Sequence, residues 1–179
     1  MKKNNSHLDL NTKTVNGYYS QLYLEQKING KENQSLVVDS SDIALLDNHK
    51  SSKYPLTESQ KEAYQLIVLI DVLNFVSDFK KLISDSKRSL KKGGRLVITC
   101  ASMALPEGNL SRAWGFTSRS IEYLLEQNFG KNWTVENYGN VLTGRYFITN
   151  KNINNLTKDH LLKKDEHFVV VTGAEAIKK

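Results

Sequence analysis

The sequence lacks the features that mark several classes of protein. It holds one cysteine, Cys100, which excludes an intramolecular disulfide framework and a cysteine-rich zinc site. No apolar run approaches the roughly 18 residues that a membrane-spanning helix needs. The charged start, residues 1–5, is not followed by the apolar stretch of a secretory signal. We therefore expect a cytoplasmic protein with no membrane span.

Glycine is scarce in the first half of the chain, and histidine is scattered. Only Gly17 and Gly30 precede residue 93, and neither lies in a glycine-rich loop that would let the backbone approach a cofactor closely. The histidines have no metal-ligand spacing, so we predict no metal site and treat them as solvated: His7, His49, His160 and His167. Cys100 follows a predicted buried strand and is interpreted as a small core residue.

The net charge of +6 suggests a nucleic-acid partner, but its distribution argues against one. Residues 1–63 carry eight basic and eight acidic residues, residues 64–130 carry nine and six, and residues 131–179 carry eight and five. The densest basic cluster comprises Lys87, Arg88, Lys91 and Lys92 at the end of a predicted helix, where the helix dipole favours cations. No aromatic residues alternate with these cations, so nucleic-acid binding is not predicted.

From residue 64 the pattern is that of an α/β protein. Residues 66–70 form a continuous aliphatic run, typical of a strand buried on both faces of a parallel sheet. Apolar residues then recur at helical spacing, and Gly93 and Gly94 predict the end of that helix before a second buried strand at residues 96–98. The segment therefore predicts one βαβ unit.

A second helix and two strands follow. Thr117 predicts an N-cap, and Gly130 predicts the end of a helix whose apolar stripe contains Ile121, Leu124, Leu125 and Phe129. Residues 133–136 and 168–172 are typical of strands. We expect an incomplete Rossmann-like, doubly wound α/β sheet, mostly parallel with an antiparallel last strand.

The first part of the chain is less regular. Residues 1–16 are polar and predicted to be a disordered tail, residues 17–63 an atypical or truncated first half, and residues 64–179 the α/β second half. The tyrosine-rich residues 17–24 fit a short helix or a strand. Residues 36–38 predict a strand that ends at Asp39.

The second half resembles the class I S-adenosylmethionine-dependent methyltransferases of the type 11 small-molecule family, in its C-terminal half. The resemblance rests on residues 71–76 (Asp-Val-Leu-Asn-Phe-Val), 89–98 (Ser-Leu-Lys-Lys-Gly-Gly-Arg-Leu-Val-Ile), 114–121 and 138–142, which occur in the family's order. The family has Glu-His where this chain has Asn74 and Phe75. The first-strand glycine loop of the family was not found, and about 60 residues of βαβ structure are absent or replaced.

The resemblance implies an adenosylmethionine cofactor and a small-molecule acceptor, such as a sugar or another metabolite. It places Asp71 and Val72, and Asp39 or Asp42, beside the cofactor. Residues 36–42 fit the third strand of the fold or a degenerate first strand, and the third strand is preferred. Asp71 also fits a cap of the next helix, and Asp39 and Asp42 fit ordinary loop carboxylates.

The acceptor side is less defined. The aromatic side chains of Trp114 and Tyr138 fit a substrate pocket or the core, and Arg112 and Arg119 fit an anionic substrate or solvated positions. No residue stands out as a catalytic base, so none is predicted. The alternative to an enzyme is a non-catalytic methyltransferase remnant that pairs an exposed sheet edge with a second chain in a homo- or hetero-oligomer.

Overall fold

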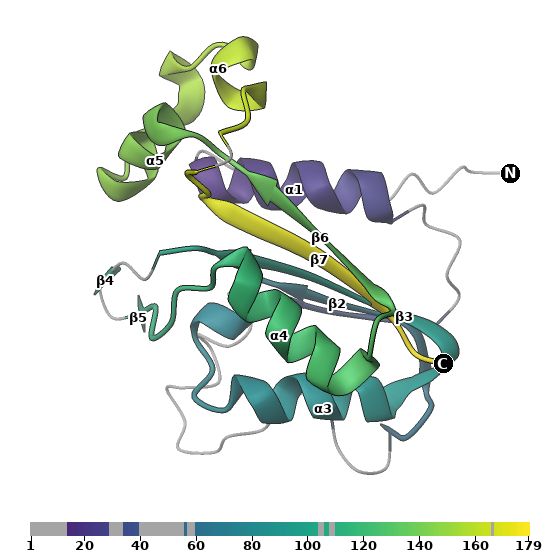
Figure 1. Cartoon of the computed structure of the whole chain (residues 1–179). Helices are drawn as coiled ribbons and strands as arrows, with labels where there is room; N and C mark the ends of the chain where they lie inside the picture. The colour runs from purple at the N-terminus through teal and green to yellow at the C-terminus, as the bar shows by residue number, and fades with distance from the viewer. Residues whose placement is uncertain are drawn as a thin grey trace, which may run out of the picture.

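The computed structural model describes residues 14–28, 34–39, 56, 60–103, 106–107, 110–165 and 167–179 (Figure 1). The helices are α1 (Val15–Lys27), α3 (Phe79–Ser89), α4 (Ser118–Phe129), α5 (Val141–Ile148) and α6 (Lys158–Leu162), with 3-10 turns η2 (Val72–Asn74) and η3 (Ile153–Asn155). The strands are β1 (Ser35–Asp39), β2 (Tyr64–Ile70), β3 (Leu90–Ala101), β4 (Pro106–Glu107), β5 (Leu110–Ser111), β6 (Trp133–Tyr138) and β7 (Val171–Ile177).

The main sheet has five strands in the order β1-β2-β3-β7-β6. Strands β1, β2 and β3 pair in parallel, and β7 runs antiparallel to both β3 and β6. Within the described residues, β7 is therefore the single reversed strand of the main sheet. The predicted fold class, mostly parallel with an antiparallel last strand, is confirmed.

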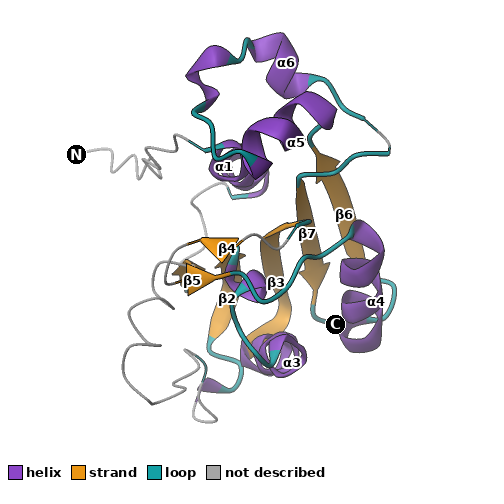
Figure 2. Cartoon of the chain, turned by 90° about the vertical axis from the view of Figure 1, so that its left-hand side faces the viewer, coloured by secondary structure: helices purple, strands orange, loops and turns teal. Residues whose placement is uncertain are grey.

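Helices cover both faces of this sheet. Figure 1 shows α1 on one face and α3 with α4 on the other, while α5 and α6 lie beyond one end of the strands. The α3–α4 face buries an aliphatic cluster that includes Leu82, Ile83 and Leu125. The α1 face buries a cluster rich in tyrosine. Figure 2 looks along the sheet toward the end where β4, β5 and α5 gather.

The second half folds largely as its pattern predicts. Strand β2 is buried from Leu66 to Ile70, because the strand lies between β1 and β3 under helices on both faces. Helix α4 begins after Thr117, whose hydroxyl accepts a hydrogen bond from the Ser120 amide, and ends before Gly130, which has a positive φ of 63°.

The predicted helix end at Gly93 and Gly94 is wrong. Helix α3 ends at Ser89, and Leu90 is already extended and begins β3. Gly93, with a φ of 76°, lies inside β3 where the pairing register with β2 shifts, and its amide donates to the Lys178 carbonyl at 2.7 Å. Glycine thus permits an irregular register within this strand. The same freedom of the backbone suits a helix end, which is why the sequence pattern was misleading.

The last strand was also predicted too early. The β-branched run at residues 168–172 suggested a strand there, whereas β7 spans Val171–Ile177 and passes through Gly173. A Cβ at Gly173 would lie 2.6 Å from the Tyr23 ring, so the tyrosine of α1 packs directly on the strand backbone. Close helix–sheet packing, rather than β propensity, determines where this strand runs.

The first part of the chain joins the same sheet. The tyrosine-rich segment is helical and belongs to α1, which begins at Val15, inside the segment predicted as a tail. Strand β1 pairs with β2 in register from Ser35↔Leu66 to Asp39↔Ile70. Doubly wound sheets of this type have the strand order 3-2-1-4-5, and the resemblance makes β2, the first strand of the second half, strand 4. Strand 1 is the neighbour of strand 4 in this order, and β1 lies beside β2. β1 therefore occupies the place of strand 1, and the preferred assignment of residues 36–42 to strand 3 is wrong.

None of the helices in the described part of the chain is long and apolar enough to cross a membrane.

Candidate functional site

The carboxyl ends of β1, β2 and β3 bring polar residues together. Asp39 ends β1, Asp71 directly follows β2, and Thr99 pairs with Ile70 near the end of β3. Sheets of this type place ligands in the crevice beyond the carboxyl ends of parallel strands. The structure therefore brings two of the predicted carboxylates, those of Asp39 and Asp71, to one edge.

Asp71 is held by side chains from two elements. Its carboxylate accepts hydrogen bonds from Asn16 Nδ2 and Ser20 Oγ on α1, both at 3.3 Å, and from Thr99 Oγ1 on β3 at 3.4 Å. Its backbone is left-handed, with φ at 56°. Asp71 precedes η2, yet its side chain accepts no capping hydrogen bond from that turn. Its contacts lie instead toward α1 and the sheet.

Burial governs the charge of this carboxyl. Asp71 is only 6% exposed, and burial raises its pKa above the ordinary value. The positive charge of Arg112 and the hydrogen bonds from Asn16 and Ser20 oppose this rise, while the negative charge of Asp39 adds to it. A cationic group that reached this edge would stabilise the ionised carboxylate, so the site is matched to a positively charged ligand.

Arg112 is part of this site, although the sequence suggested a solvated position. It is 7% exposed, and its guanidinium lies 5.8 Å from the centre of the Phe75 ring and 5.1 Å from that of Phe147. Arginine stacks well on aromatic rings and retains its charge when buried. The prediction failed because the two rings, one just after η2 and one on α5, are far apart in the sequence.

Asn74, one of the two departures from the family pattern, fixes the neighbouring loop. Its side-chain amide donates to the carbonyls of Ala101 at 2.9 Å and Trp114 at 2.7 Å, and its Oδ1 accepts from the Ala101 amide at 2.9 Å. The residue is fully buried. All its strong hydrogen-bonding positions serve the fold, so its role here is structural.

Of the other predicted cofactor residues, Asp39 shares the carboxyl edge with Asp71, whereas Val72 does not face it. Val72 is 1% exposed and packs in the aliphatic cluster, so its side chain faces the core. Asp42 lies outside the described residues. Asp39, half-buried at the end of β1, is the described carboxylate nearest along the sheet to Asp71.

The two predicted substrate residues belong to different parts of the molecule. Trp114 is 40% exposed and contacts Phe79 of α3. Tyr138 is 5% exposed and packs against Tyr19 and Tyr23 on the α1 face. The described structure does not combine Trp114 and Tyr138 in one pocket.

The basic cluster is used within the fold. Arg88 pairs with Asp85 at 2.9 Å, and Lys87 lies over the Phe129 ring and donates to the carbonyl of Asn128. Lys91 donates to the side chain of Gln34. The cations Lys87, Arg88 and Lys91 therefore have intramolecular partners. Lys87 and Arg88 lie in the last turn of α3, as predicted, whereas Lys91 and Lys92 lie in β3 rather than at a helix end.

The other titratable residues give no metal site. No group of three or more histidine, cysteine, aspartate or glutamate side chains in the described residues is arranged to hold a metal ion. Cys100 is fully buried, as predicted, and burial raises its pKa well above the ordinary value. His160 Nδ1 accepts from the Thr157 amide at 3.3 Å and completes a capping box of α6, while His7 and His49 lie outside the described residues.

Comparison with known proteins identifies the architecture. No family model matches the chain, and no curated protein matches it. A Thermotoga maritima protein, named as an S-adenosylmethionine-dependent methyltransferase and possible histamine N-methyltransferase, superposes with a TM-score of 0.56 at 12% identity over 92% of this chain and 91% of its own. A Listeria monocytogenes protein assigned to the same class gives 0.51 at 7% identity, over 89% and 96%. The chain has the class I methyltransferase fold.

The carboxyl edge fits adenosylmethionine only in part. Two carboxylates would complement its positive charges, as Asp71 and Asp39 are arranged here. However, Asp71 is 6% exposed and is covered by Asn16 and Ser20, and no glycine occurs in residues 34–39 at the end of β1. The two carboxylates match the positive charge of the cofactor, but Asn16 and Ser20 occupy space beside Asp71.

Proposed function

We propose that this chain is an S-adenosylmethionine-dependent methyltransferase that acts on a small-molecule acceptor. The observation that carries the proposal is that the carboxylates of Asp39 and Asp71 lie at the same carboxyl edge of a methyltransferase fold. Adenosylmethionine supplies a methyl group on a positively charged sulfur. The type 11 family remains the closest pattern in the sequence, and Trp114 is the residue that we assign to the acceptor side.

Each residue has a defined role in this proposal. Asp39 and Asp71 bind the positive charge of the cofactor, and Arg112 balances the buried charge and positions Asp71. Asn74 holds the segment that carries Trp114. A methyl transfer needs mainly proximity and orientation, so a dedicated base is not required by the chemistry.

Calorimetry tests cofactor binding. Titration of the full chain with adenosylmethionine and with adenosylhomocysteine should give heat for both, with weaker binding of adenosylmethionine by Asp39→Asn. Glu126→Gln, which changes an exposed carboxylate on α4, is the matched control. If neither ligand produced heat, the proposal that this chain is a methyltransferase would be rejected.

A non-catalytic partner subunit is the second candidate. The observation that favours it is the cover of Asp71 by α1, which fills the position that a cofactor would use. In the described part of the sheet, β1 and β6 are the outer strands, and an outer strand can pair with another chain. Size-exclusion chromatography with light scattering distinguishes the two: a monomer that binds adenosylmethionine supports the enzyme, and an oligomer without cofactor binding supports the subunit.

A further inference from the structure

A cavity of about 560 Å³ lies between the beginnings of α3 and α4, on the face opposite α1. Its lining comes from α3, from the segment before α4 and from the first turns of α4: Phe79, Lys80, Trp114, Gly115, Phe116, Thr117, Arg119, Ser120, Tyr123 and Leu124. Its volume falls within the range of about 300–1,000 Å³ that small-molecule sites occupy. Asp39, Asp71 and Arg112 do not line this cavity, whereas Trp114, which we assign to the acceptor side, does.

Aromatic rings form a fixed wall of the cavity. Phe79 contacts the rings of Trp114 and Phe116 edge to face, at centroid distances of 5.2 and 5.1 Å. The Trp114 indole donates from Nε1 to the Val76 carbonyl at 3.0 Å, although the side chain is 40% exposed. The indole is therefore held in place by its polar edge while part of its apolar surface faces solvent. Such a preorganised ring stacks on a planar ligand at low entropic cost.

Tyr123 supplies a second aromatic surface. It is 59% exposed on α4 and lines the same cavity as Trp114. Two partly exposed rings over a buried Phe116, which is 3% exposed, give the cavity an apolar interior.

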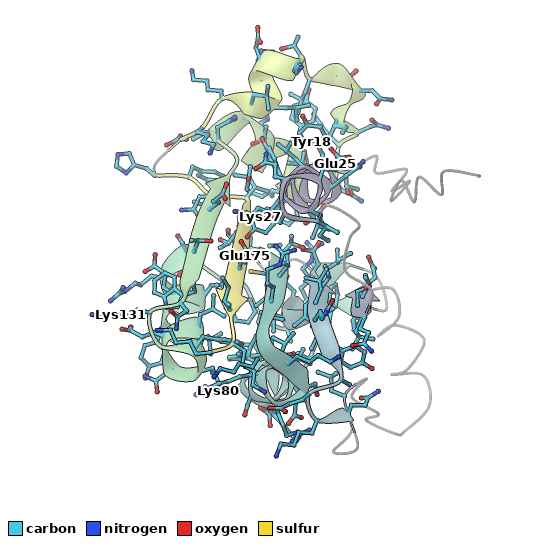
Figure 3. All side chains as sticks on the ribbon, turned by 90° about the vertical axis from the view of Figure 1, so that its right-hand side faces the viewer. Tyr18, Glu25, Lys27, Lys80, Lys131 and Glu175 are labelled. Atoms are coloured by element: carbon cyan, nitrogen blue, oxygen red, sulfur yellow. The ribbon has the colours of Figure 1, made fainter. Side chains whose placement is uncertain are left out.

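The charges at the cavity favour an anion. Lys80 and Arg119 line it, no aspartate or glutamate is among its lining residues, and Lys80 is exposed on α3 (Figure 3). Arg119 pairs with Glu122 at 3.0 Å, but its side chain is 86% exposed, and pairs of this kind are weak. The Arg119 guanidinium can therefore turn toward a ligand at small cost.

The first turn of α4 adds to this preference. Thr117 and Ser120 bring two hydroxyl groups to the cavity, and no acidic residue lies in the first turn of this helix. The positive end of the helix dipole favours a negative group at this position.

We infer that this cavity binds a planar aromatic molecule that carries a carboxylate, with the ring on Trp114 and Tyr123 and the carboxylate near Lys80 and Arg119. The rings provide stacking, and the cations select the sign of the charge. This binding requires neither adenosylmethionine nor methyl transfer, so its test is separate from that of the proposed function, which shares only Trp114 with this cavity.

Three probes of equal ring size test the inference by NMR: 2-naphthoate, neutral 2-naphthamide and cationic 2-naphthylmethylamine. The chain has two tryptophans, Trp114 and Trp133, so its spectrum holds two assignable indole N–H signals. Without adenosylmethionine, 2-naphthoate should shift the Trp114 signal and leave Trp133 in place, and it should bind most tightly of the three. An unmoved Trp114 signal, or equal affinity for the amine, would overturn the inference.

Variants separate the ring from the charge, with binding followed on the signals of the ligand. Trp114→Ala should weaken 2-naphthoate about tenfold, whereas Trp133→Phe should not. Lys80→Gln should weaken 2-naphthoate about threefold without affecting 2-naphthamide, because the loss is electrostatic. Lys92→Gln, an exposed lysine on β3, is the matched control. Trp114→Phe keeps a ring, so its partial retention of binding guards against misfolding of the alanine variant.

Discussion

The two faces of the sheet are held to their helices by different chemistry. On the α3–α4 face, aliphatic side chains such as Leu82, Ile83 and Leu125 are fully buried and make no directional bonds. On the α1 face, Tyr19 donates to the Leu161 carbonyl at 2.7 Å, and the Tyr138 hydroxyl lies 3.0 Å from Glu136 Oε2. The first face depends on buried area, while the second adds polar contacts to its own apolar cluster, among them the bond from the Tyr138 hydroxyl to Gln26 Oε1 of α1 at 3.3 Å.

Charged groups complete the α1 face. Lys27 lies 2.9 Å from Glu136 and 3.8 Å from Glu175, and Arg95 lies 2.7 Å from Glu175 (Figure 3). The Arg95 guanidinium also donates to the Lys27 carbonyl at 3.1 Å, at the end of α1. These pairs are partly exposed, so each stabilises the fold modestly. Their main consequence is to fix how α1 lies across β3, β6 and β7.

The largest loss of stability should come from the aliphatic face. Leu125→Ala removes a fully buried side chain and leaves a cavity, which should lower the free energy of unfolding by about 2–5 kcal/mol. Urea unfolding followed by circular dichroism measures it. Tyr123→Ala on the same helix, at 59% exposure, should change stability by less than about 0.5 kcal/mol. Equal losses for the two variants would contradict the assignment of the core to this face.

Gly173→Ala should cost less and act only on the α1 face. The new methyl group would lie 2.6 Å from the Tyr23 ring, so α1 must shift, at a cost of about 1–3 kcal/mol. Hydrogen exchange should show faster exchange in α1 than in α4. Gly130→Ala, where a Cβ meets nothing within 4 Å but φ is 63°, reports backbone strain alone and serves as the control. Slower exchange in α1 of Gly173→Ala would sink the packing argument.

The two faces should also differ from the carboxyl edge in their response to pH. The pKa of Asp71 is raised from 3.8 because burial disfavours its charge, so its contribution to stability is present below that value and is lost as pH rises through the folded pKa. Asp71→Asn should therefore gain stability relative to the parent as pH rises above 3.8.

Glu136 provides the opposite case. Lys27 lowers the pKa of Glu136 below 4.5, so its contribution is present above that value and is lost as pH falls through the folded pKa. Glu136→Gln should therefore be less stable than the parent above pH 4.5, and this difference should shrink as pH falls through the folded pKa. Asp71→Asn should show the opposite dependence on pH. Urea midpoints measured across this pH range give both results, and slopes of the same sign for the two variants would refute the assignment.

How well each region could be predicted from the sequence follows from the same contrast between the aliphatic α3–α4 face and the tyrosine-rich α1 face. Strand β2 and helix α4 were predicted because a continuous aliphatic run and an apolar stripe at helical spacing each leave a direct signal of burial. Helix α1 left a weaker one: Val15, Tyr19 and Tyr23 recur every four residues, but they are mostly tyrosines, which also favour strands. The candidate site could not be predicted from a sequence pattern alone. Arg112 depends on the rings of Phe75 and Phe147, and the cover of Asp71 depends on α1. The fold alone creates these contacts.

The smallest expected effect is also the one that separates shape from hydrogen bonding on the α1 face. The Tyr23 hydroxyl is buried and makes no hydrogen bond with the described residues, while the ring packs on Gly173. Burial raises the pKa of this phenol, which keeps it neutral. Tyr23→Phe should therefore leave stability unchanged or raise it by up to about 1 kcal/mol, because an unsatisfied polar group is removed. Tyr19→Phe, which loses the bond to Leu161, should instead destabilise by about 1 kcal/mol. Thermal unfolding of the pair checks the difference: a loss for Tyr23→Phe equal to that for Tyr19→Phe would show that the Tyr23 hydroxyl has a partner, and that polar contacts hold α1 along its whole length.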